Sequence, residues 1–526
     1  MSESRSIRRI AFSLALAGLC ACGTASDDNG KAGQPGGGEG GGAGSATGSG
    51  GGVSTGGYAG QGGASGSAGT GGTVTGSGGS TNAGGAGGGG AGTGGSAGSG
   101  GSAGTGGSTV RDAAAASDAR GDARPPVADA TVPTSDAALA RVVFGTNVRV
   151  NDDTGRGEQS EVSMATGAGL VLAGWMDSRS TRVCAYSVSA DGGQHWSTNV
   201  SIPMTQGSLF VGDPSVAVDS AGTLYAVCQE YIDLNAGLGN IRMMTSTDKG
   251  ATWSAVRTIQ TAPDKPWVGG GYTDGLVFAS WLGPATGTNA AGIKRSLDHG
   301  MTWEPVHLLG QIIHGTAIVA STTGVLHVPF NLDSNRNQLR YVRSKDNGAT
   351  YEAPRDLVAN MGTFCFTCSP RQHPIVGAAA DPTGKFVAIV WTSTFPGGQG
   401  DDDVWLLYSK DSGDTWSAPI RVNDNTNMSR QFEAWVAVDN YGRVHVAWTD
   451  LRNGMNETWY ARSADPTKGF EPNLQVTDGR GAATTDFLGD YKSIVVQGPD
   501  VLVIWEDTRN GNGDIYFARA PGAAGP

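Results

Sequence analysis

The segment Ser409-Lys-Asp-Ser-Gly-Asp-Thr-Trp416 decides the fold of this chain, because copies of it recur at regular spacing. In the pattern Ser-x-Asp-x-Gly-x-Thr-Trp the Asp can cap the backbone of its own turn, the Gly supplies a positive φ, and the Trp plugs the start of the next strand. The spacing of roughly fifty to sixty residues is the period of one small sheet in a β-propeller. The other copies are SADGGQHW from Ser189, STDKGATW from Ser246, SLDHGMTW from Ser296, SKDNGATY from Ser344 and a degraded SADPTKGF from Ser463.

This pattern resembles the Asp-box, also called the bacterial neuraminidase repeat, of sialidase-like β-propellers. The resemblance covers the chain from about Arg141 onward and implies an all-β propeller domain over residues 141–526. In the families that carry the box it is a structural hairpin on the rim, away from the active site. The repeat therefore predicts the fold strongly and the chemistry only weakly.

Seven repeating units can be written between residues 141 and 526. Each has two apolar strands joined by a Gly-containing turn, a third strand that leads into the box, and a fourth strand after it. The seventh unit stops after its third strand, whereas residues 148–152 (VRVND) repeat the phrase at residues 420–424 (IRVND). We therefore expect seven four-stranded blades closed by the N-terminal strand, which removes an exposed sheet edge. Sialidases have six blades, and six is the alternative if one unit is a false count.

The N-terminal 140 residues predict export and a tether. Residues 1–22 resemble a lipoprotein signal peptide, with an apolar run too short to span a membrane and a lipobox-like Leu-Cys-Ala-Cys that ends at Cys22. Ordinary cleavage without a lipid is the alternative. Residues 23–140 are rich in Gly, Ser and Ala, cannot bury a core, and are expected to be disordered. We expect an exported lipoprotein at the outer membrane or cell surface, held to the membrane through its lipid anchor only.

The charge and the resemblance limit the partners. A formal net charge of −12 argues against a nucleic-acid partner. The sialidase-like resemblance implies a glycan or glycoprotein ligand, and a monomer is expected. No cofactor is predicted. The acidic run Asp401-Asp402-Asp403 leaves open a structural calcium ion or a solvated acidic loop.

Propeller connectivity predicts where a ligand binds. The start of the first strand and the end of the second strand of each unit share one face near the axis, whereas the box lies on the opposite side and farther out. We call the face that carries the starts of the first strands and the ends of the second strands the axial face. A ligand site there is the hypothesis, and polar residues that merely keep the face soluble are the alternative. The strand-one starts carry Glu161, Asp213, Asp264, Lys265, His314, Arg371, His373, Arg430, Glu433, Asp490 and Tyr491.

The motif Trp-x-Asp-x-Arg occurs three times at strand-two ends. One interpretation is structural, with each Asp holding the Arg of its own loop. The other is functional, with the guanidinium groups directed at the axis to bind a carboxylate in a bidentate manner. The three pairs are Asp177 with Arg179, Asp450 with Arg452, and Asp507 with Arg509.

The sialidase resemblance implies catalytic roles. Sialidases hold the sugar carboxylate with three arginines and use an Asp acid/base and a Tyr nucleophile activated by a Glu. By this resemblance Tyr491 is the nucleophile, Glu433 or Glu230 its partner, and Asp177 or Asp213 the acid/base. The Arg-Ile-Pro motif of sialidases is absent, and Ser160-Glu161-Val162 stands in its place, where an acid would repel a sialic acid carboxylate. The candidate substrate-binding arginines are Arg179, Arg371, Arg430, Arg452 and Arg509.

Two functions follow from this sequence. The first is a surface-displayed glycosidase, at most an exo-sialidase with a Tyr nucleophile. The second is a non-catalytic propeller that binds a glycan or a protein through the same face. The absent Arg-Ile-Pro motif favours the second, and Tyr491 with the Asp-x-Arg loops supports the first.

The four cysteines beyond the leader predict disulfides in an oxidising compartment. Cys365 and Cys368 lie in an insertion before the fifth unit and are expected to form a disulfide. A single CxxC is weak evidence for zinc. Cys184 and Cys228 lie on adjacent units, where they either pair or remain as core thiols.

Overall fold

A computed structural model of the chain describes residues 141–525, apart from Arg156, Ser180, 234–237, 262–263, 284–289, 312–314, 333–336, 365–369, Arg371, Pro374, 395–401, Arg480 and 482–487. The predictions for the signal peptide, Cys22, the tether, the pair Cys365 and Cys368, His314, Asp401 and Arg371 fall outside the described residues. No described segment forms a helix that is long and apolar enough to cross a membrane.

The described strands form seven four-stranded antiparallel sheets. The first blade holds β2 (Gln159–Gly167), β3 (Leu170–Asp177), β4 (Val183–Ser189) and β5 (Val200–Ser201). The second holds β6 (Phe210–Val218), β7 (Leu224–Asp233), β8 (Leu238–Ser246) and β9 (Arg257–Thr261). The third holds β10 (Asp264–Gly270), β11 (Val277–Leu282), β12 (Ala290–Ser296) and β13 (His307–Gln311). The fourth holds β14 (Val319–Ala320), β15 (Leu326–Leu332), β16 (Gln338–Ser344) and β17 (Arg355–Val358).

The remaining three blades follow in chain order. The fifth holds β18 (Gly377–Ala380), β19 (Val387–Ser393), β20 (Asp403–Ser409) and β21 (Ile420–Arg421). The sixth holds β22 (Gln431–Val438), β23 (Val444–Asp450), β24 (Glu457–Ser463) and β25 (Leu474–Gln475), with the 3-10 turn η1 (Pro466–Lys468) between the last two strands. The seventh holds β26 (Ser493–Gln497), β27 (Asp500–Asp507), β28 (Asp514–Ala520) and β1 (Val148–Arg149).

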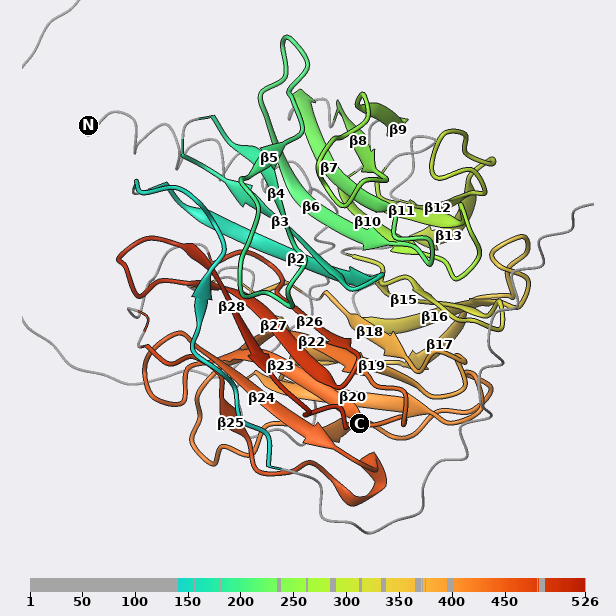
Figure 1. The fold of residues 1–526 in the computed structure, drawn as a ribbon. Coiled ribbons are helices and arrows are strands. Elements are labelled where there is room, and N and C mark those ends of the chain that lie inside the picture. Colours follow the sequence, from blue (N-terminus) through green and yellow to red (C-terminus); the bar gives the residue numbers. More distant parts are fainter. Residues whose placement is uncertain are drawn as a thin grey trace, which may run out of the picture. The chain divides into compact units, whose positions relative to one another are not determined.

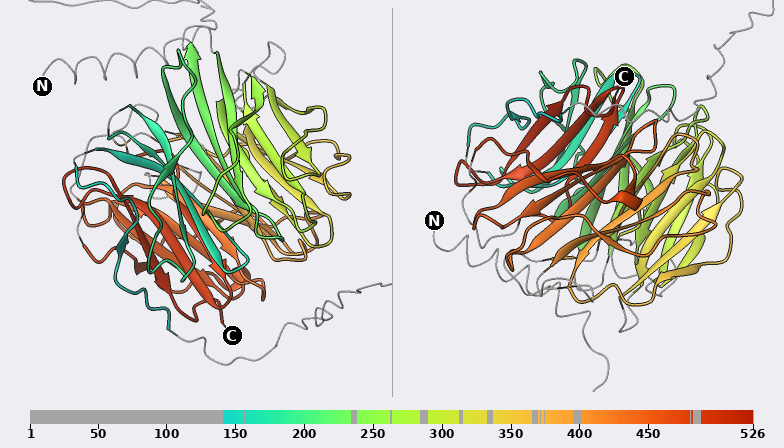
Figure 2. Two further views of the ribbon diagram at one scale, coloured as in Figure 1. Left: turned by 45° about the horizontal axis from the view of Figure 1, so that its top comes forward. Right: turned by 90° about the horizontal axis from the view of Figure 1, so that it is seen from below.

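The sheets close into a ring. The innermost strands contact each other in the order β2, β6, β10, β14, β18, β22 and β26, and β26 in turn contacts β2 (Figures 1 and 2). The N-terminal strand β1 completes the seventh blade, where Val148 pairs with Phe517 and Arg149 with Tyr516. The predicted propeller of seven blades closed by the N-terminal strand is confirmed, and the six-blade alternative is excluded.

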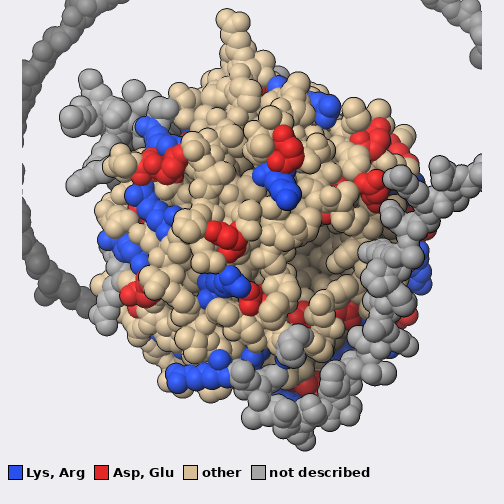
Figure 3. Space-filling model, viewed as in Figure 1, with Lys and Arg blue, Asp and Glu red and all other residues tan. Residues whose placement is uncertain are grey.

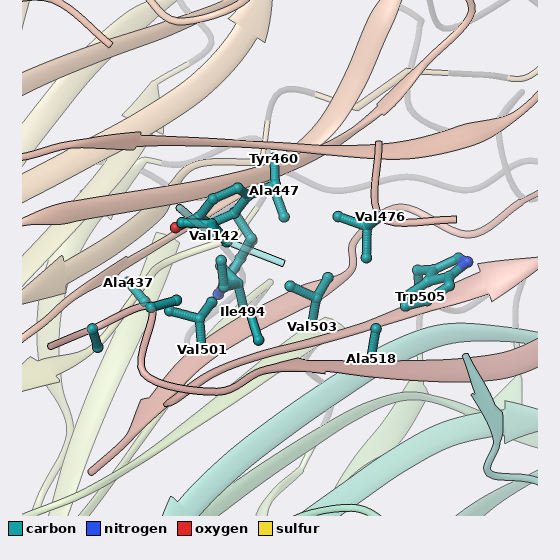
Figure 4. Packing of buried hydrophobic residues seen from close by; sticks show 14 of the residues in the cluster. Val142, Ala437, Ala447, Tyr460, Val476, Ile494, Val501, Val503, Trp505 and Ala518 are labelled. Carbon is teal, nitrogen blue, oxygen red and sulfur yellow. The ribbon is translucent and has the colours of Figure 1, made fainter. Parts of the chain in front are cut away.

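Apolar side chains fill the space between neighbouring sheets. The second strands of five blades each bury a tryptophan completely, at Trp175, Trp281, Trp391, Trp448 and Trp505. Figure 4 shows one such layer, in which Ala437 and Ala447 of the sixth blade meet Ile494, Val501 and Val503 of the seventh. Because a strand in such a stack is buried on both faces, it reads as a continuous apolar run rather than an alternating one.

The repeated turns have the hydrogen bonds that their sequence predicts. The Asp411 carboxylate accepts from the Thr415 backbone N–H at 2.8 Å and from its hydroxyl at 2.6 Å. Ser409 Oγ donates to Asp411 at 2.7 Å and accepts from the Gly413 N–H at 2.7 Å. These bonds to the ionised form, chiefly those from Thr415, lower the pKa of Asp411 from 3.8 to about 2. The turns beginning at Ser246, Ser296 and Ser344 repeat this network.

The glycines of these turns are contact points between blades. Gly413 has a φ of 83°, and a Cβ placed on it would lie 2.3 Å from the hydroxyl oxygen of Tyr341 in the preceding blade. Gly348 is similarly pressed against Phe278, and Gly300 against Met243. The glycine is therefore required twice, for its backbone conformation and for close packing.

A disulfide joins the first two blades. Cys184 on β4 and Cys228 on β7 are bonded, with their Cα atoms 6.3 Å apart. Of the two alternatives left by the sequence, the structure shows the paired one.

Acid should weaken the fold through the repeated turns. The folded-state pKa of Asp411 lies below the ordinary value of 3.8, so its stabilising contribution is present above about pH 4 and is lost as the pH falls towards 2. We expect Asp411→Asn to be less stable than wild type at pH 7 and to lose less stability between pH 5 and pH 2. Urea unfolding followed by tryptophan fluorescence measures both slopes. Asp356→Asn, at an exposed carboxylate on β17 that pairs with Arg340 outside these turns, is the control. Equal slopes for Asp411→Asn and wild type would contradict the assignment.

The packing role of the turn glycines can be separated from their conformational role. Gly413→Ala should cost about 2–4 kcal/mol, because it combines left-handed strain with a clash against a buried ring. Gly454→Ala is the matched control, since its φ is 74° and a Cβ placed on it would have nothing within 4 Å, so it should cost about 1 kcal/mol. Thermal or urea unfolding of the two variants gives the difference. If they lose the same stability, the turn glycines do not act through contacts between blades.

Candidate axial site

Charged residues occupy a strained backbone position at the axial ends of four innermost strands. Each lies at a β-bulge, where the register with the second strand shifts. All four have a left-handed backbone, which costs a non-glycine residue on the order of 1 kcal/mol. The fourth blade has Gly315 (φ 64°) before its first strand, a residue that adopts this conformation without cost. The four charged residues are Glu161 (φ 53°), Asp213 (φ 50°), Lys265 (φ 47°) and Glu433 (φ 55°).

Lys265 of the third blade binds residues of three other blades at the axis. Its ammonium lies 2.6 Å from Asp213 of the second blade, 2.7 Å from Asp490 at the entry to the seventh, and 3.4 Å from Glu161 of the first. The Lys265 side chain is only 10 % exposed and that of Asp490 is fully buried. We call Glu161, Asp213, Lys265 and Asp490 the axial cluster. Buried ions of opposite charge are tolerated when they are paired in this way.

Two further groups extend the axial cluster. The Tyr231 hydroxyl donates to Asp213 at 2.5 Å and lies 2.8 Å from Asp264. Burial, and then the neighbouring charge of Asp213, raise the pKa of Asp264. His373, which enters the fifth blade, places Nε2 3.5 Å from Asp490. Five blades thus contribute to one connected network at the axial ends of the strands.

Aromatic rings fill the axis beside this network. Trp267 of the third blade and Trp435 of the sixth lie with ring centroids 5.0 Å apart, and Tyr491 meets Trp267 edge to face at 5.4 Å. These described side chains therefore meet across the axis of the ring at this level.

A second group of charges lies between the sixth and seventh blades. Lys492 is buried, with its ammonium 3.7 Å from Glu433 and 3.2 Å from the Thr458 hydroxyl. Burial lowers the pKa of Lys492 to about 8 and raises that of Glu433 to about 7. Glu506 on β27 has two buried oxygens without a hydrogen-bond partner among the described residues, and burial raises its pKa well above the ordinary value. Groups whose environments shift their pKa values in this way are typical of functional sites.

The structure places Tyr491 beside the axial cluster in an arrangement unlike that of an activated nucleophile. Its hydroxyl donates to the Pro214 carbonyl at 3.2 Å. Burial, followed by the nearby carboxylates of Glu161 and Asp213, raises its pKa well above 10. Its expected partner Glu433 instead accepts from the Thr449 hydroxyl at 2.8 Å and faces Lys492. The alternative partner Glu230 binds Arg242 at 3.1 Å and the Thr205 N–H at 2.8 Å.

The arginines of the Trp-x-Asp-x-Arg motifs form clasps between blades. Arg179 binds Asp177 of its own loop and also Asp152, 2.7 Å away on the segment that follows β1. The same arrangement joins Arg452 to Asp450 and to Asp424, and Arg509 to Asp507 and to Asp478. Each clasp links the end of a second strand to the segment after the last strand of the preceding blade. This geometry matches the structural interpretation of the motif, and it places the proposed acid/base Asp177 in a clasp rather than in the axial cluster.

The remaining predicted site residues are also engaged in ion pairs. Arg430 binds Asp402 at 3.0 Å and the Pro370 carbonyl at 3.0 Å. Asp403 of the acidic run binds Arg421 at 2.7 Å. On the face drawn in Figure 3, several basic side chains likewise lie next to acidic ones. Arg371 lies outside the described residues, so its role stays a prediction.

Some members of this site were not recognisable from the sequence. Lys492 and Glu506 were not singled out, although Lys492 follows Tyr491 directly and Glu506 lies inside one of the Trp-x-Asp-x-Arg motifs. A polar residue beside a motif residue looks like an exposed neighbour in the sequence. Only the packing of the sixth blade against the seventh shows that both are buried.

Removing the central cation should destabilise the ring. Lys265→Met leaves Glu161, Asp213 and Asp490 buried together without their ammonium, which should cost about 3–5 kcal/mol at pH 7. The loss should shrink at pH 5, where carboxylates begin to take up protons. Chemical unfolding at both pH values tests this, with the exposed Lys468→Met as the control. A loss below about 1 kcal/mol, the typical value of a surface ion pair, would show that the axial cluster is not a true buried network.

Comparison with known proteins identifies similar folds. No protein-family model matches the chain. The endosialidase of phage phi92 shares 12 % identity at a TM-score of 0.45, over 72 % of this chain and 69 % of that one. The Hadza microbial sialidase Hz136 shares 18 % identity at 0.40, over 56 % of this chain and 64 % of its own, which is less than two thirds of its length. The alpha-l-arabinofuranosidase arb93a from Fusarium graminearum shares 12 % identity at 0.42, over 72 % of this chain and 98 % of that one. At these identities the similarity concerns the fold alone.

Proposed function

We propose that this propeller is a glycoside hydrolase that acts on uncharged glycans at the axial face, with Glu433 as its general acid. The observation that carries the proposal is the set of four charged residues held in left-handed backbone at the axial ends of the innermost strands. A fold that needed only soluble polar groups there would not require strained, buried ones, and such strain concentrates at functional sites. The choice of a glycan rests on the resemblance of the repeated turn to the Asp-box.

The two groups of charges each offer a carboxyl group for one of the two roles that glycoside hydrolysis requires. Glu433, with a pKa raised to about 7 by burial, holds a proton near neutral pH that it can give to a leaving oxygen. The complementary carboxylate is one of the axial cluster, in which the Lys265 ammonium lies 2.6 Å from Asp213. We assign this role to Asp213 because its side chain is 7 % exposed, whereas that of Asp490 is fully buried.

The electrostatics favour an uncharged substrate over a sialic acid. Among the described residues, the axial cluster holds three carboxylates around one ammonium. A further carboxylate brought into this group would be repelled, because like charges in a site of low dielectric disfavour each other. The Tyr491 hydroxyl is bonded to a backbone carbonyl, and within the described part of the chain no hydrogen bond joins it to a carboxylate that would activate it.

A second candidate is a non-catalytic propeller that binds a glycan with the same face. Two observations favour it. Lys265 already binds three carboxylates, and Tyr491 is buried, so neither group is free to act on a substrate without a rearrangement. Surface display through a lipid on Cys22 remains part of either proposal.

Hydrolysis of a panel of fluorogenic glycosides, neutral hexosides and pentosides beside a sialoside, decides between these functions. We expect turnover of a neutral glycoside that falls as the pH rises through about 7, because the acid must be protonated. Glu433→Gln should lower kcat about 10²–10⁴-fold and remove this pH limb. Glu304→Gln, at a rim carboxylate, should leave both unchanged.

Other results would reassign the function. Turnover of the sialoside that is lost in Tyr491→Phe would establish the Tyr-based sialidase. An absence of turnover on every substrate, together with glycan-array binding that survives in Glu433→Gln, would establish the binding module.

A further inference from the structure

Apart from Arg156, which lies outside the described residues, the segments 149–159 and 421–431 fold as two copies of one structure. The sequences RVNDDTGRGEQ and RVNDNTNMSRQ align without a gap. In one copy the Asn151 side chain accepts from the Ile515 N–H at 2.8 Å and donates to Asp514 at 2.9 Å. In the other, Asn423 accepts from the Val404 N–H at 2.8 Å and donates to Asp403 at 2.7 Å. The second copy therefore serves as an internal reference for the first.

The two copies differ at one buried side chain. Asn425 accepts through Oδ1 from Asn423 and Arg421 and donates through Nδ2 to the Asn427 carbonyl at 2.9 Å and to Ser429 Oγ at 3.1 Å. The equivalent residue in the first copy is Asp153. Its Oδ1 accepts from Asn151 and Arg149 in the same way. Its Oδ2, in the place of the donating amide, is buried and has no hydrogen-bond partner among the described residues.

The first copy also lacks two side chains that occupy space in the second copy. Gly155 and Gly157 stand where the reference copy has Asn427 and Ser429. An open cavity of about 570 Å³ lies there, lined by residues 152–155, Gly157, Ser178 and Arg179. Asp153, which carries the buried Oδ2, thus lines a cavity where the reference copy has the side chains of Asn427 and Ser429. Leaving such an oxygen unpaired is costly, because the group has given up its hydration without replacement.

We propose that this cavity is a calcium site in which Asp153 is the buried ligand. Carboxylate and backbone carbonyl oxygens are the ligands that Ca²⁺ prefers, and its coordination shell tolerates irregular geometry and several waters. Asp152 contributes a second carboxylate, which is 35 % exposed and is shared with Arg179 at 2.7 Å. The backbone of Thr154 and Gly155 lines the same space. The site is distinct from the axial cluster and from the Asp401-Asp402-Asp403 run.

A cation here would strengthen the closure of the ring. Asp152 and Asp153 directly follow the closing strand β1, and Arg179 belongs to the first blade. The ion would therefore act at the junction where the two ends of the ring meet. The proposal does not depend on the function of the axial face.

The reference copy supplies the test variant. Asp153→Asn installs the residue that the same fold already accommodates at Asn425, so it should fold while losing the ligand. We expect the full-length, EDTA-treated chain to bind one Ca²⁺ in a calorimetric titration with CaCl₂ and to melt at a higher temperature with Ca²⁺. Asp153→Asn should bind at least about tenfold more weakly and show no Ca²⁺-dependent rise in Tm. Asp424→Asn, at the position in the reference copy that corresponds to Asp152, should titrate like wild type.

The melting temperatures should also change order. In EDTA, Asp153→Asn should melt above wild type, because its amide can donate where Asp153 Oδ2 is unpaired. In Ca²⁺, wild type should melt above the variant. Wild type that shows neither binding heat nor a Tm shift with CaCl₂ would overturn the proposal, whether or not the variant folds. So would equal Ca²⁺ binding by wild type and a folded Asp153→Asn, judged by its circular dichroism spectrum.

Discussion

The pairing of β1 with β28 is the constraint on which the rest of the structure depends. Two residue pairs, Val148 with Phe517 and Arg149 with Tyr516, add the N-terminal strand to the last sheet and so tie the two ends of the ring together. The axial cluster exists only because of this closure, since Lys265 of the third blade holds carboxylates of the first, second and seventh. Buried ion pairs of this kind require that the partners be brought together by the fold, because their own attraction scarcely exceeds the cost of removing them from water.

Local signals in the sequence were sufficient for the fold. The conformation of the repeated turn is determined locally, because Asp411 forms hydrogen bonds with Ser409 and Thr415 within a stretch of eight residues. The closing strand was recognisable because the phrase at residues 148–152 repeats the one at residues 420–424. Each of these signals is a short-range or repeated pattern, and each is confirmed by the sheet order.

The site was predictable in its location and not in its connections. Propeller topology brought Glu161, Asp213, Lys265 and Asp490 to one face, as expected. Which partner each group selects depends on side-chain reach across several blades, and no spacing in the sequence encodes that. The arginines of the clasps show the same limit. From the sequence, each could equally bind an incoming carboxylate or the Asp of its own loop. Only the structure shows the second Asp of each clasp, which lies on the preceding blade and binds Arg179, Arg452 or Arg509.

The clasps have a mechanical consequence. The residues that precede 141 join the ring through the segment that ends in β1, so a pulling force on the N-terminal part of the chain is passed along this segment to the two-residue strand. A strand that short would peel away easily if its ladder bonds carried the load alone. At one end of it Asn147 exchanges hydrogen bonds of 2.8 Å with Asp478, and at the other Asp152 is held by Arg179. Side chains on both sides of the strand thus share the load. A force on the N-terminal segment must break these side-chain contacts as well as the β1–β28 hydrogen bonds before the ring opens.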